Sequence, residues 1–203
     1  MPFAYYQRLS KKARRIYDAS DAVVRIDLGQ TGPAEAACAS VQAALAAADK
    51  RALKKASQAL ADAICDDRQV PRVEIRVLVK RPKDETEELH GLYVRADDGG
   101  AVIRVWMRTA ERRDVVKPKT YLHTLLHEIV HHLDYDLLKL EDSLHTEGFY
   151  KRENSLFKQV AGELAKTVRA RPPRASAAEA SPSAAPVTEP AARKPTQLSL
   201  FEL

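Results

Sequence analysis

The clearest hydrophobic pattern in the chain is an apolar stripe in its second half. Its residues recur at intervals of three and four positions, which is the spacing of one helix face. They are Leu122, Leu125, Leu126, Ile129, Leu133, Leu137 and Leu140. No Gly or Pro lies between Lys119 and Lys139, and Pro118 stands where the first turn of a helix accepts a proline. The pattern predicts a core helix over this stretch.

The first 69 residues form a region that also has helical spacing. Over residues 3–20, apolar positions alternate with basic ones at Arg8, Lys11, Lys12, Arg14 and Arg15. This predicts an amphipathic helix whose basic face is either solvated or in contact with a DNA backbone. A short apolar segment follows at 23–28, and an Ala-rich helical region runs from 33 to 65 with a break at Asp49.

From Val70 the hydrophobic period changes to two, which is typical of half-buried strands. Strands are predicted from residue 70 to 80, from 89 to 95 and from 101 to 108, with Asp97-Asp-Gly-Gly100 as a hairpin turn. We predict an antiparallel meander that leads into the core helix. The third strand is either an edge that accepts an extended peptide or a paired central strand. The predicted fold class is therefore α+β.

Length and composition limit the kinds of protein that this chain can be. The 203 residues suit one domain plus an extension, and the net charge of +5 is compatible with a nucleic-acid environment. Cys38 and Cys65 are far apart in the sequence, and we expect both to be small buried residues. The start of the chain lacks a secretory signal and no apolar run is long enough to span a membrane. We expect no membrane association and a cytoplasmic location.

The core helix contains His127-Glu-Ile-Val-His131, an H-E-x-x-H pattern. Residues four apart lie on one helix face, so both imidazoles can point at one metal ion. Glu128 then lies where it reaches a water polarised by that ion. The pattern predicts a metal site with Glu128 as its general base.

A catalytic zinc ion usually has three protein ligands and one open position. The chain is predicted to turn near residues 141–143, after which His145 can supply the third ligand, with Glu147 and Glu153 as the alternatives. A further helix with apolar positions from 156 to 164 follows.

Nearby polar residues have predicted supporting roles. His123 is expected on the helix surface or behind a ligand, and His132 beside an acid. Asp134 or Asp136 can orient a ligand imidazole by accepting its free N–H.

This arrangement, His131 followed by His145-Thr-Glu-Gly-Phe149-Tyr150, resembles the H-E-x-x-H…H-x-x-x-F-[WY] pattern of the SprT-like, WLM and YgjP-like zinc metallopeptidases. The match covers roughly residues 70–168. The resemblance implies a zincin-like core, one Zn²⁺ ion bound by His127, His131 and His145, and catalysis by Glu128. It departs from the SprT pattern at Thr146 and in having no Cys-based zinc ribbon.

The resemblance also suggests a protein substrate crosslinked to, or stalled on, DNA. Tyr150 and Arg152 are candidates for stabilising the oxyanion. Two alternatives remain open: a non-catalytic zinc-binding adaptor, and a metallopeptidase that acts on a regulatory protein.

After residue 168 the composition changes. Residues 169–196 hold six of the eleven prolines together with Ala and Ser, which predicts a disordered linker. The chain ends in an apolar peptide made of Gln197, Leu198, Ser199, Leu200 and Phe201, followed by Glu202 and Leu203. The first five residues resemble the Q-L-[SD]-L-F motif of proteins that bind the bacterial DNA sliding clamp.

A linker of this length reaches on the order of 30 Å, so clamp binding would keep the core near DNA, in a nucleoid-associated location. The alternative is an apolar terminus that folds back onto the domain.

Overall fold

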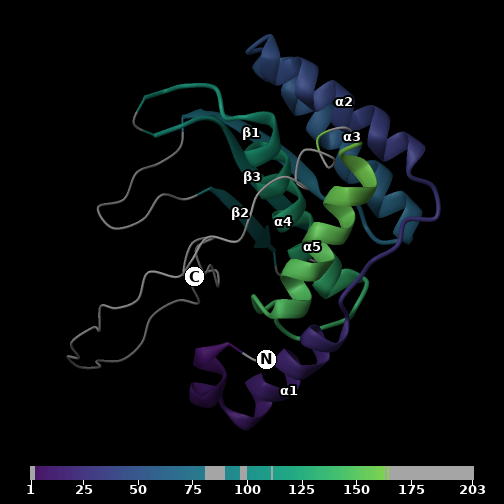
Figure 1. Ribbon diagram of the computed structural model, residues 1–203, viewed down its shortest axis with the longest axis vertical. Helices are drawn as coiled ribbons and strands as arrows, with labels where there is room; N and C mark the ends of the chain where they lie inside the picture. Colours follow the sequence, from purple (N-terminus) through teal and green to yellow (C-terminus); the bar gives the residue numbers. More distant parts are fainter. Residues whose placement is uncertain (1–2, 81–89, 97–99, 111, 163, 165–203) are drawn as a thin grey trace.

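The computed structural model describes residues 3–80, 90–96, 100–110, 112–162 and 164 (Figure 1). These residues form an α+β fold, as predicted. Its elements in chain order are the 3-10 helix η1 (Ala4–Arg8), α1 (Lys11–Ala22), α2 (Gly32–Ala46), α3 (Lys50–Arg68), β1 (Glu74–Lys80), β2 (Gly91–Arg95), β3 (Ala101–Arg108), α4 (Pro118–Asp136) and α5 (Glu147–Val160).

The sheet differs from the predicted antiparallel meander. Its strand order is β1-β3-β2, with β3 parallel to β1 and antiparallel to β2. The prediction of β3 as a candidate edge strand was therefore wrong, because β3 is the central strand and β2 lies at an edge. The short link between β2 and β3 favours antiparallel pairing, whereas the long separation of β1 from β3 permits a parallel crossover.

Local capping explains where the helices begin. Asp49 accepts hydrogen bonds from the amides of Arg51 and Ala52, which confirms the predicted break before α3. The single helix predicted over 3–20 is two elements, because Ser10 caps α1 by accepting from the amide of Ala13. Helix α4 begins with Pro118 in its first turn, as its sequence predicts.

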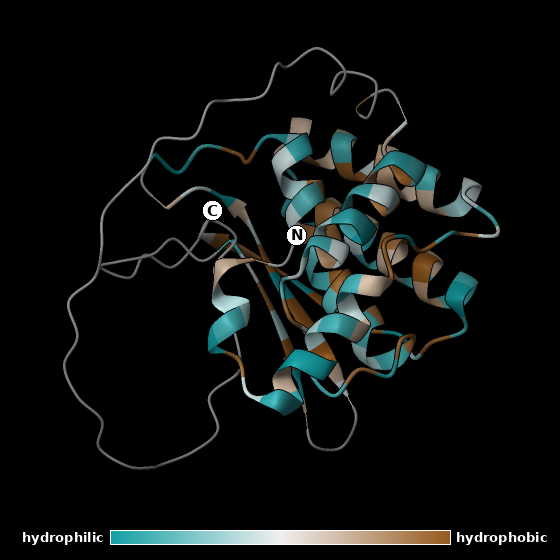
Figure 2. Ribbon diagram, turned by 60° about the horizontal axis from the view of Figure 1, so that its bottom comes forward, coloured by the Kyte–Doolittle hydropathy of each residue, from teal (hydrophilic) through white to brown (hydrophobic). Residues whose placement is uncertain are grey.

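The core lies between the helices and the sheet. Helix α4 packs against β2, β3 and α5; α3 packs on β1; and α2 and α3 lie side by side (Figure 1). The apolar stripe of α4 is fully buried from Leu122 to Leu133. Figure 2 shows hydrophobic residues gathered toward the interior and hydrophilic residues on the outer helix faces. One continuous apolar cluster extends from Ile26 to Ala161, so α4 is held in place from several sides.

Some predictions lie outside the described residues. These are the tip of the hairpin turn at 97–99, the charged loop at 81–89, the linker at 169–196 and the terminal peptide at 197–203. In the part of the chain that the structure describes, no helix is long and apolar enough to cross a membrane.

Candidate metal centre

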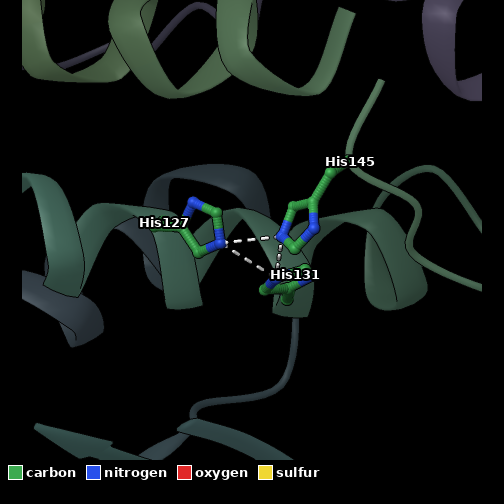
Figure 3. A group of neighbouring side chains, drawn as sticks. All are labelled: His127, His131 and His145. Carbon is green, nitrogen blue, oxygen red and sulfur yellow. Dashed lines mark hydrogen bonds between the residues drawn. The ribbon is translucent and has the colours of Figure 1, made fainter. Parts of the chain in front are cut away.

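The structure brings the three predicted histidine ligands together. Helix α4 supplies His127 and His131 from one face, and His145 comes from the irregular connection between α4 and α5 (Figure 3). The Nε2 atom of His127 lies 3.2 Å from that of His131 and 2.9 Å from that of His145. The Nε2 atoms of His131 and His145 are 3.2 Å apart. Three ring nitrogens therefore converge on one point.

This spacing fits a metal ion. Two nitrogens bound tetrahedrally at about 2.0–2.1 Å from an ion are roughly 3.3 Å apart, close to the observed separations. Burial, followed by the charge of His127, lowers the pKa of His131 well below its usual value and that of His145 to about 3. Both rings are therefore neutral near pH 7, with lone pairs free to bind a cation. The three histidines could hold a metal ion.

Phe149 packs against this group from one side. Its side chain is fully buried, and its ring centroid lies 4.8 Å from that of His127, 4.7 Å from that of His131 and 5.0 Å from that of His145. One aromatic ring thus contacts every imidazole. Because a packed ring restricts rotation of its neighbours, Phe149 limits the orientations open to all three.

A chain of polar groups orients His131. Its Nδ1 lies 2.7 Å from Oγ of Ser143, which in turn donates to Asp134 at 2.8 Å. With the Nδ1 proton used in this way, Nε2 keeps its lone pair toward the centre. Burial raises the pKa of Asp134 to about 6, against the opposing effects of Arg152 and Ser143. Asp134 therefore acts on His131 through Ser143, not by the direct contact that was predicted.

The placement of Arg152 contradicts its predicted role as an oxyanion donor. The residue is fully buried and its guanidinium forms an ion pair of 2.8 Å with Asp134. It also donates to the backbone carbonyls of Ser20 and Val23. Burial favours its use as a structural cation, and these bonds commit its Nη atoms to Asp134, Ser20 and Val23.

Glu153 supports His127 and does not join the ligand group. One of its carboxylate oxygens lies 3.2 Å from Nδ1 of His127, and the other lies 2.8 Å from Nδ1 of His123. Burial alone would raise the pKa of Glu153, but the hydrogen bonds and charges of the two histidines lower it below its usual value. A carboxylate held ionised in this way fixes the Nδ1–H tautomer of His127. The other alternative ligand, Glu147, pairs with Lys151 at 2.7 Å on the surface.

The remaining predicted residues lie around the site. Tyr150 is half-buried and its ring stacks on His145 at 5.8 Å, so its predicted oxyanion role stays a prediction. His132 is paired with an acid, as predicted, because its Nδ1 lies 3.2 Å from Asp136. Asp136 also bonds to Arg95, and among the described residues its partners are not the three ligand histidines.

Glu128 is held against β2. Its carboxylate accepts a hydrogen bond from the backbone amide of Tyr93. A Cβ atom on Gly91 would lie 2.3 Å from Glu128 Oε1, so only glycine leaves room for this carboxylate. Burial raises the pKa of Glu128 to about 7, against the lowering effects of His127 and the Tyr93 amide. A carboxyl group with a pKa near neutrality suits proton transfer at that pH.

Sequence reasoning missed three contributors to the site: Ser143, Gly91 and Tyr93. A glycine inside a predicted strand is a known sign of close backbone approach, so Gly91 carried a usable signal. Nothing in the residue types or spacing of Ser143 and Tyr93 indicated their partners, because both contacts are made by tertiary packing.

We predict that Glu128→Gln stabilises the metal-free protein at high pH. The pKa of Glu128 is about 7 in the fold against an ordinary value of 4.5, so wild-type stability is lost as pH rises through this window. Glutamine does not titrate. The free energy of unfolding of the variant, minus that of the wild type, should increase by about 3 kcal/mol between pH 4.5 and pH 7.5. Denaturant unfolding in chelator measures it, and a constant difference would contradict the burial argument.

The site combines three imidazoles that could hold a metal ion with a buried carboxyl group on α4. No family model, curated protein or solved structure matches the chain. Its geometry therefore carries the functional argument.

Proposed function

We propose that the protein is a zinc-dependent metallopeptidase that hydrolyses peptide bonds. The observation that carries the proposal is the convergence of three histidine Nε2 atoms beside a buried glutamate on the same helix. Three nitrogen ligands from His127, His131 and His145 suit a zinc ion that keeps a fourth position for water or substrate. The H-E-x-x-H spacing and the resemblance to SprT-like peptidases favour this chemistry over other metal-assisted hydrolysis.

The chain's own residues have separate parts in the reaction. When bound, a zinc ion lowers the pKa of water and polarises a carbonyl group. Glu128 accepts a proton from the attacking water, whose oxygen bonds to the scissile carbonyl carbon. As the carbon–nitrogen bond breaks, Glu128 donates that proton to the leaving amine. Glu153 and Ser143 keep the Nδ1 protons of His127 and His131 in place throughout.

The edge strand β2 provides a way to bind the substrate. Among the described residues, β2 pairs with a strand on only one side, where β3 lies. The amide of Tyr93 bonds to Glu128, so this part of β2 lies beside the proposed base. An extended peptide that adds to β2 would thus lie alongside the base. This assigns to β2 the role first predicted for β3.

The proposed setting is the bacterial DNA sliding clamp. The support is the Gln197-Leu-Ser-Leu-Phe201 peptide, which follows a Pro- and Ala-rich segment long enough to act as a tether. A clamp-bound enzyme would meet proteins on DNA at raised effective concentration. The competing proposal is an adaptor in which the same zinc site has no catalytic role.

We predict that Glu128→Gln lowers kcat for protein or peptide hydrolysis by roughly 10²–10⁴-fold while one zinc ion per chain is retained, because the base is removed and the ligands remain. His145→Ala should lose both activity and tight zinc binding. Metal content by elemental analysis and cleavage of an unstructured protein measure the two effects.

Glu74→Gln is the matched control, since Glu74 is an exposed glutamate paired with Arg76. It should behave as wild type. A zinc-loaded wild-type protein that cleaves nothing faster than Glu128→Gln would support the adaptor instead.

We also predict that Gly91→Ala lowers kcat by roughly 10²-fold with zinc affinity unchanged. The new methyl group would meet the flexible end of Glu128, which must move away from its place beside the centre. Displacement of a catalytic group by about 1 Å is enough for a loss of this size. Gly32→Ala is the control, because nothing lies within 4 Å of the added atom. Equal kcat in both variants would show that the position of Glu128 is not critical.

For the tail, Leu200→Ala combined with Phe201→Ala should abolish binding to a purified bacterial sliding clamp. The reason is that the apolar pair is the part expected to fill a hydrophobic pocket. Hydrolysis of a generic peptide should stay unchanged. Glu202→Ala is the control, and binding is measured by surface plasmon resonance. Clamp binding that survives the double substitution would end the proposal of a tether.

A further inference from the structure

We infer that the N-terminal segment, residues 3–23, positions the third metal ligand, so that the three-histidine centre is complete only when this segment is docked. The inference rests on the proposed metal centre and assigns a role to a part of the chain that the H-E-x-x-H pattern does not reach. Helix α4 by itself fixes His127 and His131. His145 lies on an irregular connection, so its position depends on what that connection contacts.

Three hydrogen bonds join the N-terminal segment to the residues at and just after His145. The hydroxyl of Tyr5 donates to the carbonyl of His145 at 2.6 Å. The hydroxyl groups of Ser20 and Thr146 lie 3.3 Å apart in a buried position. The carboxylate of Asp21 accepts from the amide of Gly148 at 2.7 Å. The segment thus contacts the connection on both the ligand residue itself and the start of α5.

Close backbone packing reinforces these bonds. A Cβ atom on Gly148 would lie 2.6 Å from the carbonyl oxygen of Asp21 and 2.7 Å from that of Ser20. Both obstacles are backbone atoms, which cannot turn aside as a flexible side chain can. The first turn of α5 therefore packs directly on the end of α1, and any shift of α1 is passed to the residues that follow His145.

The same segment is tied to a second ligand through Arg152. This buried guanidinium donates to the carbonyls of Ser20 and Val23 at 2.6 and 2.5 Å, where the last carbonyls of α1 need partners. It also pairs with Asp134, which holds Ser143 against His131. One cation therefore links the end of α1 to the groups that orient a metal ligand.

Aromatic contacts complete the arrangement. The ring of Phe3 meets that of Tyr150 edge-on at 6.2 Å, and Tyr150 stacks on His145 at 5.8 Å. Tyr5 also packs edge-on against Tyr17 of α1, with ring centroids 5.9 Å apart. The side chain that approaches His145 is thus supported from within its own segment, which keeps its hydroxyl directed at the ligand's backbone.

Zinc affinity of the full-length chain tests the inference. Tyr5→Phe removes one hydroxyl group from a half-buried residue, and Asp21→Ala removes the acceptor of the Gly148 amide. Each should weaken zinc binding roughly tenfold in competition with a chromophoric chelator, because supporting groups around a ligand have effects of this size. Asp21→Asn keeps an acceptor oxygen and should recover most of the affinity.

Tyr6→Phe is the matched control. Its hydroxyl bonds to Asp18 inside the same segment, so its loss should leave zinc affinity within about twofold of wild type. Thermal unfolding of the metal-free proteins checks that every variant is folded. Tyr5→Phe changes a single atom, so it remains informative even where Asp21→Ala unfolds.

Hydrogen exchange gives a second readout. Coupling between two sites is reciprocal, so zinc added to the wild-type chain should slow amide exchange in peptides from residues 3–23. Peptides from the first half of α2 should change little. The inference would be overturned by two results together. Tyr5→Phe and Asp21→Ala would bind zinc as tightly as Tyr6→Phe, and zinc would not protect residues 3–23 from exchange. A wild-type chain that binds no zinc would overturn the proposed function along with it.

Discussion

The structure depends on keeping three imidazole nitrogens within about 3 Å of one another inside the protein. Polar nitrogens held this close need partners, because burial removes the solvent that would otherwise satisfy them. The fold must therefore hold each imidazole from behind. Glu153 does so for His127 and Ser143 for His131, while Phe149 packs against all three rings. A cation bound at the centre would stabilise the folded state, because the unfolded chain has no such site.

Two buried carboxyl groups, Glu128 and Glu153, have pKa values that their surroundings shift in opposite directions. Glu153 accepts hydrogen bonds from two imidazoles, which lower its pKa. It therefore stays ionised and orients both rings. Glu128 is buried with the amide of Tyr93 as its hydrogen-bond donor, and its pKa rises to about 7. Opposite shifts in neighbouring carboxyl groups are a common sign of different roles in proton transfer. The contrast supports the proposed role of Glu128 as the base on physical grounds that do not depend on the motif.

Local patterns were enough to predict most elements of this fold. The helical period identified α4, the capping residue Asp49 marked the start of α3, and alternation located all three strands. Alternation reports which residues face a core, but it is silent on which strands are neighbours, so the order β1-β3-β2 was missed. The histidines could be predicted because helix geometry and a short connection bring them together. Arg152 could not be assigned correctly, because two of its partners, the carbonyls of Ser20 and Val23 at the end of α1, are more than a hundred residues away in sequence.

The position of Glu128 also bears on how substrate and base would work together. Gly91 and Tyr93, which hold the carboxylate, belong to the strand edge that would bind an extended peptide under the proposed function. The Tyr93 amide can donate only one strong hydrogen bond. A substrate carbonyl that accepts this hydrogen bond would therefore replace Glu128 as its acceptor. Glu128 would lose a hydrogen bond that lowers its pKa just as the peptide arrives, and its affinity for a proton would rise. Substrate binding would then itself prepare the base, which is how binding energy contributes to a chemical step.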